Sequence, residues 1–306
     1  MRMETSAENL SSGAPDPSGA FSTLATVMRG ELKRHCYRMM ASAHDAEDCV
    51  QEALLRGWRE YGALRDKTSG RPWLYSIATR VCLDALRSRK RRQTLFAPSL
   101  DETAPGTEPW VEPWVSEGGD DIRLAFVSLL HGLTPRARAV LLLHDAVGMT
   151  AGEAAGALGL SVAAARSALQ RARAALPPPV PTRIALPVDA YVDAWNAGDV
   201  AALIGLLHND IVMTMPPWQT TFVGRDAVEV FMRMVWPRHD GFRAVALTAN
   251  GQPAVAIYTK QGDGPYRAHS LHVLAGQGLV SELILYAPPL GAALFAGFGM
   301  DAAWRT

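Results

Sequence analysis

The sequence predicts a multidomain chain in which two all-α helical units, the second containing a helix-turn-helix, precede an α+β unit. Three observations support this fold class. Apolar residues recur at helical spacing between about residues 21 and 93, a capped helix, a glycine turn and a second helix follow within residues 134–176, and β-type segments dominate after residue 186. The 306 residues suffice for roughly two or three compact units.

Composition narrows the class of protein. Basic and acidic residues number 30 each, so any nucleic-acid surface must be local. The three cysteines, Cys36, Cys49 and Cys82, fit neither a disulfide framework nor a zinc spacing, and we expect buried thiols without metal or cofactor. The chain lacks a signal-peptide core and an apolar run of the about 20 residues that cross a bilayer. We therefore expect a cytoplasmic protein with no membrane contact.

The first helical unit is expected over residues 21–95, after a Ser, Gly and Pro-rich leader (1–20) that predicts disorder. Its first amphipathic helix, DAEDCVQEALLRGWREY, has an apolar stripe of Cys49, Val50, Ala53, Leu54 and Trp58. The second, RPWLYSIATRVCLDALRSRKRR, has a stripe of Trp73, Ile77, Val81 and Leu86. The second helix then runs into basic residues, which we expect to face solvent.

Two stretches without periodicity separate the predicted units. Residues 96–120 are rich in proline, glycine and acidic residues and predict a linker. The PPPVP sequence within residues 177–185 predicts a second, stiffer linker, because consecutive prolines cannot continue a helix.

The unit at residues 121–176 carries the signals of a helix-turn-helix. Thr134 is suited to cap a helix that begins at Pro135, and Thr150 with Glu153 matches a capping box. Gly159 is suited to the positive φ that ends a helix, and a further helix follows it. A helix-turn-helix by itself is compatible with a repressor, a recombinase or a sigma subunit.

The last helix of this unit, SVAAARSALQRARAAL, begins after Ser161, a predicted cap. Its apolar stripe consists of Val162, Ala165, Leu169, Ala172 and Leu176. Its exposed candidates for DNA contact are Arg166, Ser167, Gln170, Arg171 and Arg173. An isolated helix of this composition is more simply a solvated surface helix, and the capped helix and turn before it favour DNA recognition.

Four segments together resemble the extracytoplasmic-function (group four) sigma factors of bacterial RNA polymerase. They are DAEDCVQEALLRGWREY, PWLYSIATRVCLDALRSRKRR, LTPRARAVLLLHDAVGMTAGEAAGALGLS and the helix from Ser161. The resemblance covers about residues 21–176. It implies a factor that binds the beta-prime and beta subunits of core polymerase, recognises two promoter elements and opens DNA without covalent chemistry.

The resemblance assigns roles to residues of the first unit. It implies polymerase docking by Asp45, Asp48, Gln51, Glu52 and Arg56. It implies contact with minus-ten DNA, including capture of a flipped base, by Lys67, Thr68, Ser69, Arg71, Trp73, Arg80, Arg87, Arg89, Lys90 and Arg91. The acidic residues also suit the positive end of a helix dipole, and Trp73 equally suits the core.

The resemblance assigns minus-thirty-five recognition to the helix from Val162. The sequence departs from many relatives at Ala163, Ala164 and Ala168, where polar or basic side chains are common. Direct readout then depends on fewer side chains, and DNA shape and phosphate contacts are expected to carry more of the specificity.

Residues 186–290 resemble the SnoaL-like, nuclear transport factor two-like cone, a curved and mostly antiparallel sheet wrapped around a pocket by helices; residues 291–306 are expected to be a tail. In sigma factors this appendage implies regulation. Candidate residues for a ligand pocket are Trp195, Met213, Met215, Trp218, Phe231 and His272, although such a cluster also suits a plain core.

Two other functions stay open from the sequence. One is a ligand-responsive helix-turn-helix repressor, which needs no polymerase-docking helix. The other is a sigma factor whose last unit retains catalysis, for which the candidates are His208, Asp210, His269 and His272. Strict alternation along a strand points His269 and His272 to opposite faces, so no acid/base pair is evident and we expect no enzymatic activity.

Overall fold

The computed structural model describes residues 17–96, 111–114, 124–176 and 186–304, except residue 219. The described residues form two compact units. We call the first, residues 17–40, 44–93 and 134–173, the helical unit, and the second, which contains the remaining described residues, the sheet unit. Leader residues 1–16 and most of both predicted linkers lie outside the described residues.

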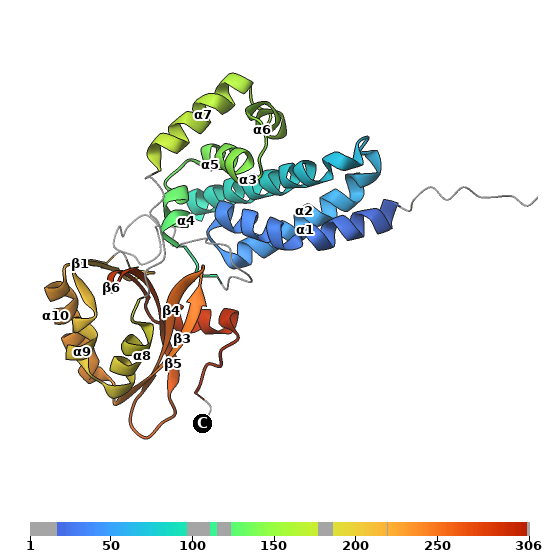
Figure 1. Cartoon of the computed structure of the whole chain (residues 1–306). Coiled ribbons are helices and arrows are strands. Elements are labelled where there is room, and N and C mark those ends of the chain that lie inside the picture. The colour runs from blue at the N-terminus through green and yellow to red at the C-terminus, as the bar shows by residue number, and fades with distance from the viewer. Residues whose placement is uncertain (1–16, 97–110, 115–123, 177–185, 219, 305–306) are drawn as a thin grey trace, which may run out of the picture. The chain divides into compact units, whose positions relative to one another are not determined.

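The helical unit begins with three long helices (Figure 1). They are α1 (Pro17–Met40), α2 (Ala43–Glu60) and α3 (Gly70–Phe96), and short 3₁₀ turns at Tyr61–Ala63 and Lys67–Ser69 join the last two. Helix α1 begins at Pro17, inside the segment expected to be a disordered leader. The prediction that Trp58 is core is wrong, because its side chain is 60% exposed.

The predicted caps of the helix-turn-helix are confirmed. Its elements are α5 (Pro135–Leu141), a π-helical turn η3 (Leu142–Ala146), α6 (Ala151–Leu158) and α7 (Val162–Ala175). Thr150 and Glu153 form the capping box, and Gly159 ends α6 with φ of 63°. The Ser161 hydroxyl accepts from the Ala164 amide at 3.2 Å. Along α7, Ala165, Leu169 and Ala172 are buried, whereas Val162 is 42% exposed and does not belong to the core.

The sheet unit contains a six-stranded sheet in the order β2-β1-β6-β5-β4-β3. Its strands are β1 (Leu207–Thr214), β2 (Thr221–Val223), β3 (Gly241–Ala249), β4 (Gln252–Lys260), β5 (Arg267–Gln277) and β6 (Leu279–Tyr286). The β1–β6 pairing is parallel and the others are antiparallel, which confirms the predicted α+β class.

Helices α8 (Val188–Ala197), α9 (Val200–Gly205) and α10 (Arg225–Val235) cover the concave face of the sheet (Figure 1). They bury Tyr191, Trp195, Val228 and Met232 against strand residues such as Leu283. A further helix, α4 (Leu124–His131), precedes the helix-turn-helix in the chain.

The expected tail belongs to the fold of the sheet unit. Helix α11 (Leu290–Leu294) and a 3₁₀ turn at Phe295–Phe298 follow β6, and the Phe295 side chain is 1% exposed. Ala303 then forms a bridge with Arg267 of β5. The tail prediction is therefore wrong for the described residues.

Residues 111–114, which the sequence places in a linker, are bonded to the sheet. The Trp114 amide donates to the Asn250 side-chain oxygen at 2.7 Å, and the Asn250 amide donates to the Trp114 carbonyl at 2.8 Å. The Tyr286 hydroxyl donates to the Val111 carbonyl at 2.7 Å. This part of the predicted linker is held in place by hydrogen bonds.

Candidate interface helices and the pocket of the sheet unit

Helix α2 presents one exposed face with both polar and apolar side chains. Its members recur at helical spacing and are Asp48, Gln51, Leu55 and Trp58. Leu55 and Trp58 are 51% and 60% exposed, and two large apolar side chains one helical turn apart make this face a candidate surface for another protein. Sequence reasoning missed Leu55, although the three-and-four spacing from Asp48 could have identified it.

The other predicted docking residues form ion pairs within the helical unit. Glu52 Oε1 lies 2.7 Å from Arg56 Nε, and Arg56 also reaches Asp84 at 3.7 Å. Asp45 Oδ2 lies 3.4 Å from Arg89 Nη1. All five side chains are at least a third exposed, so these pairs stabilise the fold little and can open toward a partner.

The loop before α3 is organised by Asp66, which sequence reasoning missed. Its carboxylate accepts from the Thr68 amide at 2.9 Å, the Thr68 hydroxyl at 2.6 Å and the Ser69 hydroxyl at 2.7 Å. The side-chain hydrogen bonds from Thr68 and Ser69 lower the pKa of Asp66. Both hydroxyls thus shape the loop, and the Lys67 side chain lies outside the described part of the structure.

Two larger side chains follow this loop. Arg71 Nη2 lies 3.1 Å from Glu31 Oε2, and its guanidinium lies 5.2 Å from the centre of the Tyr75 ring. Trp73 is half-buried, with its ring centre 6.1 Å from that of Tyr61. Trp73 is thus only partly covered by the helical unit.

The basic residues predicted on α3 lie on its exposed surface. They are Arg80, Arg87, Arg89, Lys90 and Arg91. Three of them, Arg80, Arg87 and Lys90, line a groove of about 630 Å³ in the helical unit together with Arg56 and Arg136. The acidic lining consists of Glu60 and Asp84, so positive charge prevails and suits a polyanion.

The exposed residues of α7 differ in how they are held. Arg166 and Gln170 are exposed, and Arg171 Nη1 donates to the Ser167 hydroxyl at 2.5 Å. Arg173 is paired with Asp145 of η3, with Nε 3.2 Å from Oδ2, and this hydrogen bond lowers the pKa of Asp145. Arg173 therefore ties α7 to η3, the turn before α6, a role that the sequence does not reveal.

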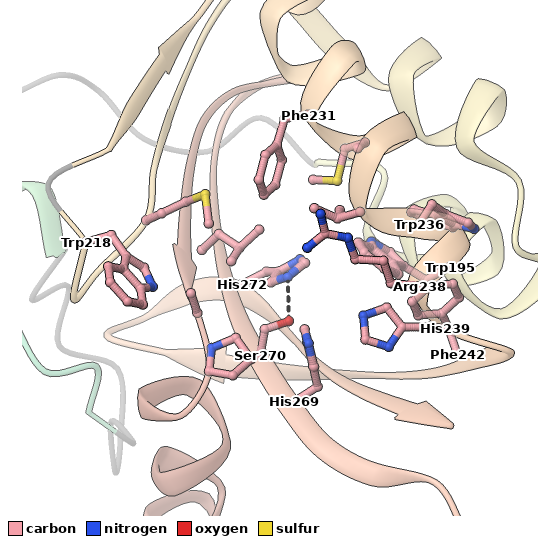
Figure 2. A pocket seen from close by; sticks show the side chains of 16 residues that line it. Trp195, Trp218, Phe231, Trp236, Arg238, His239, Phe242, His269, Ser270 and His272 are labelled. Carbon is pink, nitrogen blue, oxygen red and sulfur yellow. Dashed lines mark hydrogen bonds between the residues drawn. The ribbon is translucent and has the colours of Figure 1, made fainter. Parts of the chain in front are cut away.

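A cavity of about 270 Å³ lies within the sheet unit (Figure 2). Trp195, Met215, Trp218, Phe231 and His272 line it, as the sequence predicts. The assignment of Met213 to the lining is wrong. Its side chain is fully buried within the core of the sheet unit and does not reach the cavity.

A β-bulge brings two histidines to the same cavity. Ile257 pairs with Ser270 and Tyr258 with Ala268, which leaves His269 as an extra residue in β5. His269, Ser270 and His272 consequently all line the cavity (Figure 2). The prediction that strict alternation separates His269 from His272 is wrong for this reason. His208 and Asp210 are absent from the lining, and their side chains are 49% and 92% exposed.

His272 lies at the centre of a buried hydrogen-bond chain. The Tyr191 hydroxyl lies 2.9 Å from His272 Nδ1, and the Ser270 hydroxyl lies 3.0 Å from His272 Nε2. Burial lowers the pKa of His272 to about 3 and raises the pKa of Tyr191. Both groups are neutral near pH 7, and both imidazole nitrogens are engaged, so His272 is poorly suited to accept a proton from a substrate.

Comparison with known families identifies three segments. The family description Sigma-70 region 2 matches residues 24–92, Sigma-70 region 4 matches residues 123–176, and the SnoaL-like domain matches residues 188–280. In the described part of the chain, no helix is long and apolar enough to cross a membrane.

Individual relatives match from 61% to 94% of this chain. The ECF RNA polymerase sigma factor SigG of Mycobacterium tuberculosis is 36% identical over 321 aligned residues, which cover 94% of this chain and 85% of the relative. The ECF RNA polymerase sigma factor SigJ of Mycobacterium tuberculosis is 33% identical over 200 residues. The crystal structure of SigJ matches with a TM-score of 0.64 and 26% identity over 90% of this chain and 98% of that one.

Proposed function

This chain belongs to the extracytoplasmic-function RNA polymerase sigma factors and carries a SnoaL-like domain, so its partners are core RNA polymerase and promoter DNA. We propose that the exposed residues of α2 bind core polymerase and that α3, the loop before it and α7 bind DNA. The exposed face of α2 carries the proposal. Asp48 and Gln51 supply polar contacts to core polymerase, and Leu55 and Trp58 supply the apolar area that becomes buried. Asp45, Glu52 and Arg56 form the rim of this contact.

The loop before α3 and the exposed face of α3 contact the minus-ten element. Thr68 and Ser69, held by Asp66, frame the site for a flipped base, and the exposed part of Trp73 offers a stacking surface. The basic residues Arg80, Arg87, Arg89, Lys90 and Arg91 neutralise phosphates, which makes the affinity fall as the salt concentration rises.

Helix α7 contacts the minus-thirty-five element. Gln170, and Arg171 with its hydrogen-bonded Ser167, are suited to base edges, and Arg166 is suited to a phosphate. Arg173 supports this surface by holding α7 against Asp145.

The SnoaL-like domain regulates the sigma function and has no catalytic activity of its own. The separation of His208 and Asp210 from the cavity and the buried, neutral His272 support this assignment. The relatives are named as sigma factors and not as enzymes.

In vitro transcription tests the assignment as a whole. Purified core polymerase is incubated with the full chain on a library of genomic fragments, and transcript starts are mapped. We expect new starts that share two upstream elements. Fragments that are bound by the chain alone, with no promoter-specific transcripts when polymerase is present, would instead identify a repressor.

A further inference from the structure

The cavity of the SnoaL-like domain has an apolar body and a cationic mouth. Aromatic and thioether side chains, among them Met215, Trp218 and Phe231, form most of its wall. Trp195 and Trp236 close one side as a stacked pair with ring centres 4.4 Å apart. Walls of this kind favour a flat apolar ligand, because π faces and sulfur atoms pack well against rings.

The polar residues of the wall lie together. Arg238, in the turn after α10, lines the cavity, and the rings of His239 and His269 pack edge to face with their centres 4.9 Å apart (Figure 2). The lining contains no acidic residue, and in the described part of the chain Arg238 forms no ion pair. Asp240 lies two residues after Arg238 in the chain, and its carboxylate accepts instead from the Gly262 amide at 2.7 Å. A cation without a counter-ion beside an apolar cavity favours an anionic ligand group.

The two histidines add neutral hydrogen-bonding groups to this end. Burial lowers the pKa of His269 to about 4, and burial and Arg238 lower the pKa of His239. The buried Nδ1 atom of His239 has no hydrogen-bond partner among the described residues. A buried polar atom without a partner costs free energy, which a ligand that reaches it would recover.

We propose that this cavity binds a small planar aromatic carboxylate, with the ring system against Phe231 and Met215 and the carboxylate at Arg238 and His239. The volume of about 270 Å³ lies near the lower end of the range for small-molecule sites, roughly 300–1,000 Å³. Such a ligand would act on the regulatory domain, and only the effect of the ligand on transcription rests on the proposed function. Binding itself requires neither polymerase nor DNA.

Isothermal titration calorimetry of the full chain tests the proposal with three probes of known chemistry. They are 1-naphthoate, its neutral analogue 1-naphthalenemethanol, and the saturated cyclohexanecarboxylate. We expect 1-naphthoate to bind more tightly than either of the others, because only it has both the flat ring and the negative charge.

Two arginine variants separate the cavity from nonspecific binding. Arg238→Gln should weaken 1-naphthoate binding about tenfold or more and leave 1-naphthalenemethanol unchanged. Arg233→Gln is the matched control, since Arg233 is an exposed arginine of α10 paired with Glu229. It should leave both affinities unchanged. Unchanged melting temperatures confirm that both variants fold.

Several outcomes would overturn the proposal. These are no binding of 1-naphthoate by the wild-type chain, equal binding of the neutral probe, or equal losses in the two arginine variants. None of them affects the sigma assignment, which the transcription experiment tests separately. Conversely, if the chain binds 1-naphthoate but supports no transcription, the ligand-binding proposal stands and the proposed sigma function is rejected.

Discussion

At the scale of single residues, buried histidines stay neutral in the folded protein. His35 is 2% exposed, its Nε2 lies 2.8 Å from the Thr79 hydroxyl, and burial lowers its pKa to about 3. The positive charge of Arg38 acts in the same direction as burial. His272 in the sheet unit is the corresponding case, with a pKa of about 3.

Because these buried histidines have lowered pKa values, we expect the unfolding free energy of the protein to fall in acid. The unfolded chain, with a histidine pKa of about 6.5, takes up protons before the folded chain does, so their contribution is fully present above pH 6.5 and is lost as the pH falls toward 3. Each such group contributes up to about 1.4 kcal/mol per pH unit in this window. His35→Gln should therefore flatten the dependence of the unfolding free energy on pH.

Urea unfolding at pH 7, 6 and 5, followed by helical circular dichroism, measures this slope. His44→Gln is the control, because the His44 side chain is 82% exposed. Equal slopes for His35→Gln and wild type would reject a neutral buried His35.

Readout of DNA also belongs to the residue scale. Gln170→Ala should change which minus-thirty-five sequences the holoenzyme selects, since an amide side chain recognises a base edge. Arg166→Ala should weaken binding to all sequences and reduce the salt slope by about one. Selection from a randomised promoter library, with the exposed Gln277→Ala as control, checks both expectations. An unchanged sequence preference for Gln170→Ala would reduce α7 to a phosphate-binding helix.

At the scale of elements, the capping box determines where α6 begins. The Thr150 hydroxyl accepts from the Glu153 amide at 3.2 Å, and the Glu153 carboxylate accepts from the Thr150 amide at 2.7 Å. A helix as short as α6 depends strongly on such caps, because it contains few internal hydrogen bonds.

Thr150→Ala should lower the unfolding free energy by about 1 kcal/mol and weaken binding to the minus-thirty-five element. Urea unfolding and electrophoretic mobility shifts with the holoenzyme measure the two effects. Thr23→Ala is the control, because the exposed Thr23 lies inside α1 and its hydroxyl donates to the Gly19 carbonyl of the same helix. Equal unfolding free energies of the two variants would mean that the capping box does not stabilise α6.

The exposed face of α2 predicts a second effect at this scale. Trp58→Ala should lower the affinity for core polymerase about tenfold or more, as expected for an interface tryptophan, and leave the unfolding free energy almost unchanged. Biolayer interferometry with purified core polymerase measures the affinity. Val230→Ala, which shortens an apolar side chain that is 70% exposed on α10 and does not line the cavity, is the control. If both variants bind core polymerase like wild type, this face of α2 is not the docking surface.

At the scale of the whole molecule, sigma regions 2 and 4 are joined in one chain to a domain of independent architecture. The SnoaL-like domain has its own core, in which Tyr191, Ile211 and Leu283 are almost completely buried. A domain with a complete core can bind a ligand and change its stability without unfolding the rest of the chain.

Removal of residues 182–306 should change promoter-specific transcription severalfold, because it takes away the proposed regulatory domain. Single-round transcription and core affinity of the truncated and full chains measure the change, and circular dichroism confirms that the truncated chain remains helical. Identical transcription and identical affinity would leave the domain without a regulatory role.

Local chemistry made much of this protein predictable from its sequence. The caps at Thr134, Thr150, Gly159 and Ser161 and the order of helical and β segments depend on residues a few positions apart, and the structure contains each of them. Features that depend on distant partners were not predictable. Trp58 and Val162 are exposed because no other element of the described chain covers them.

The sequence by itself determined the fold class and the sigma family, since helical periods, caps and family motifs are local patterns. Only the tertiary structure decided which histidines meet in the pocket. The bulge at His269 arises from the register between β4 and β5, and it places His269 beside His239 of another element. Strand register depends on pairing between segments far apart in the chain, which no local pattern encodes.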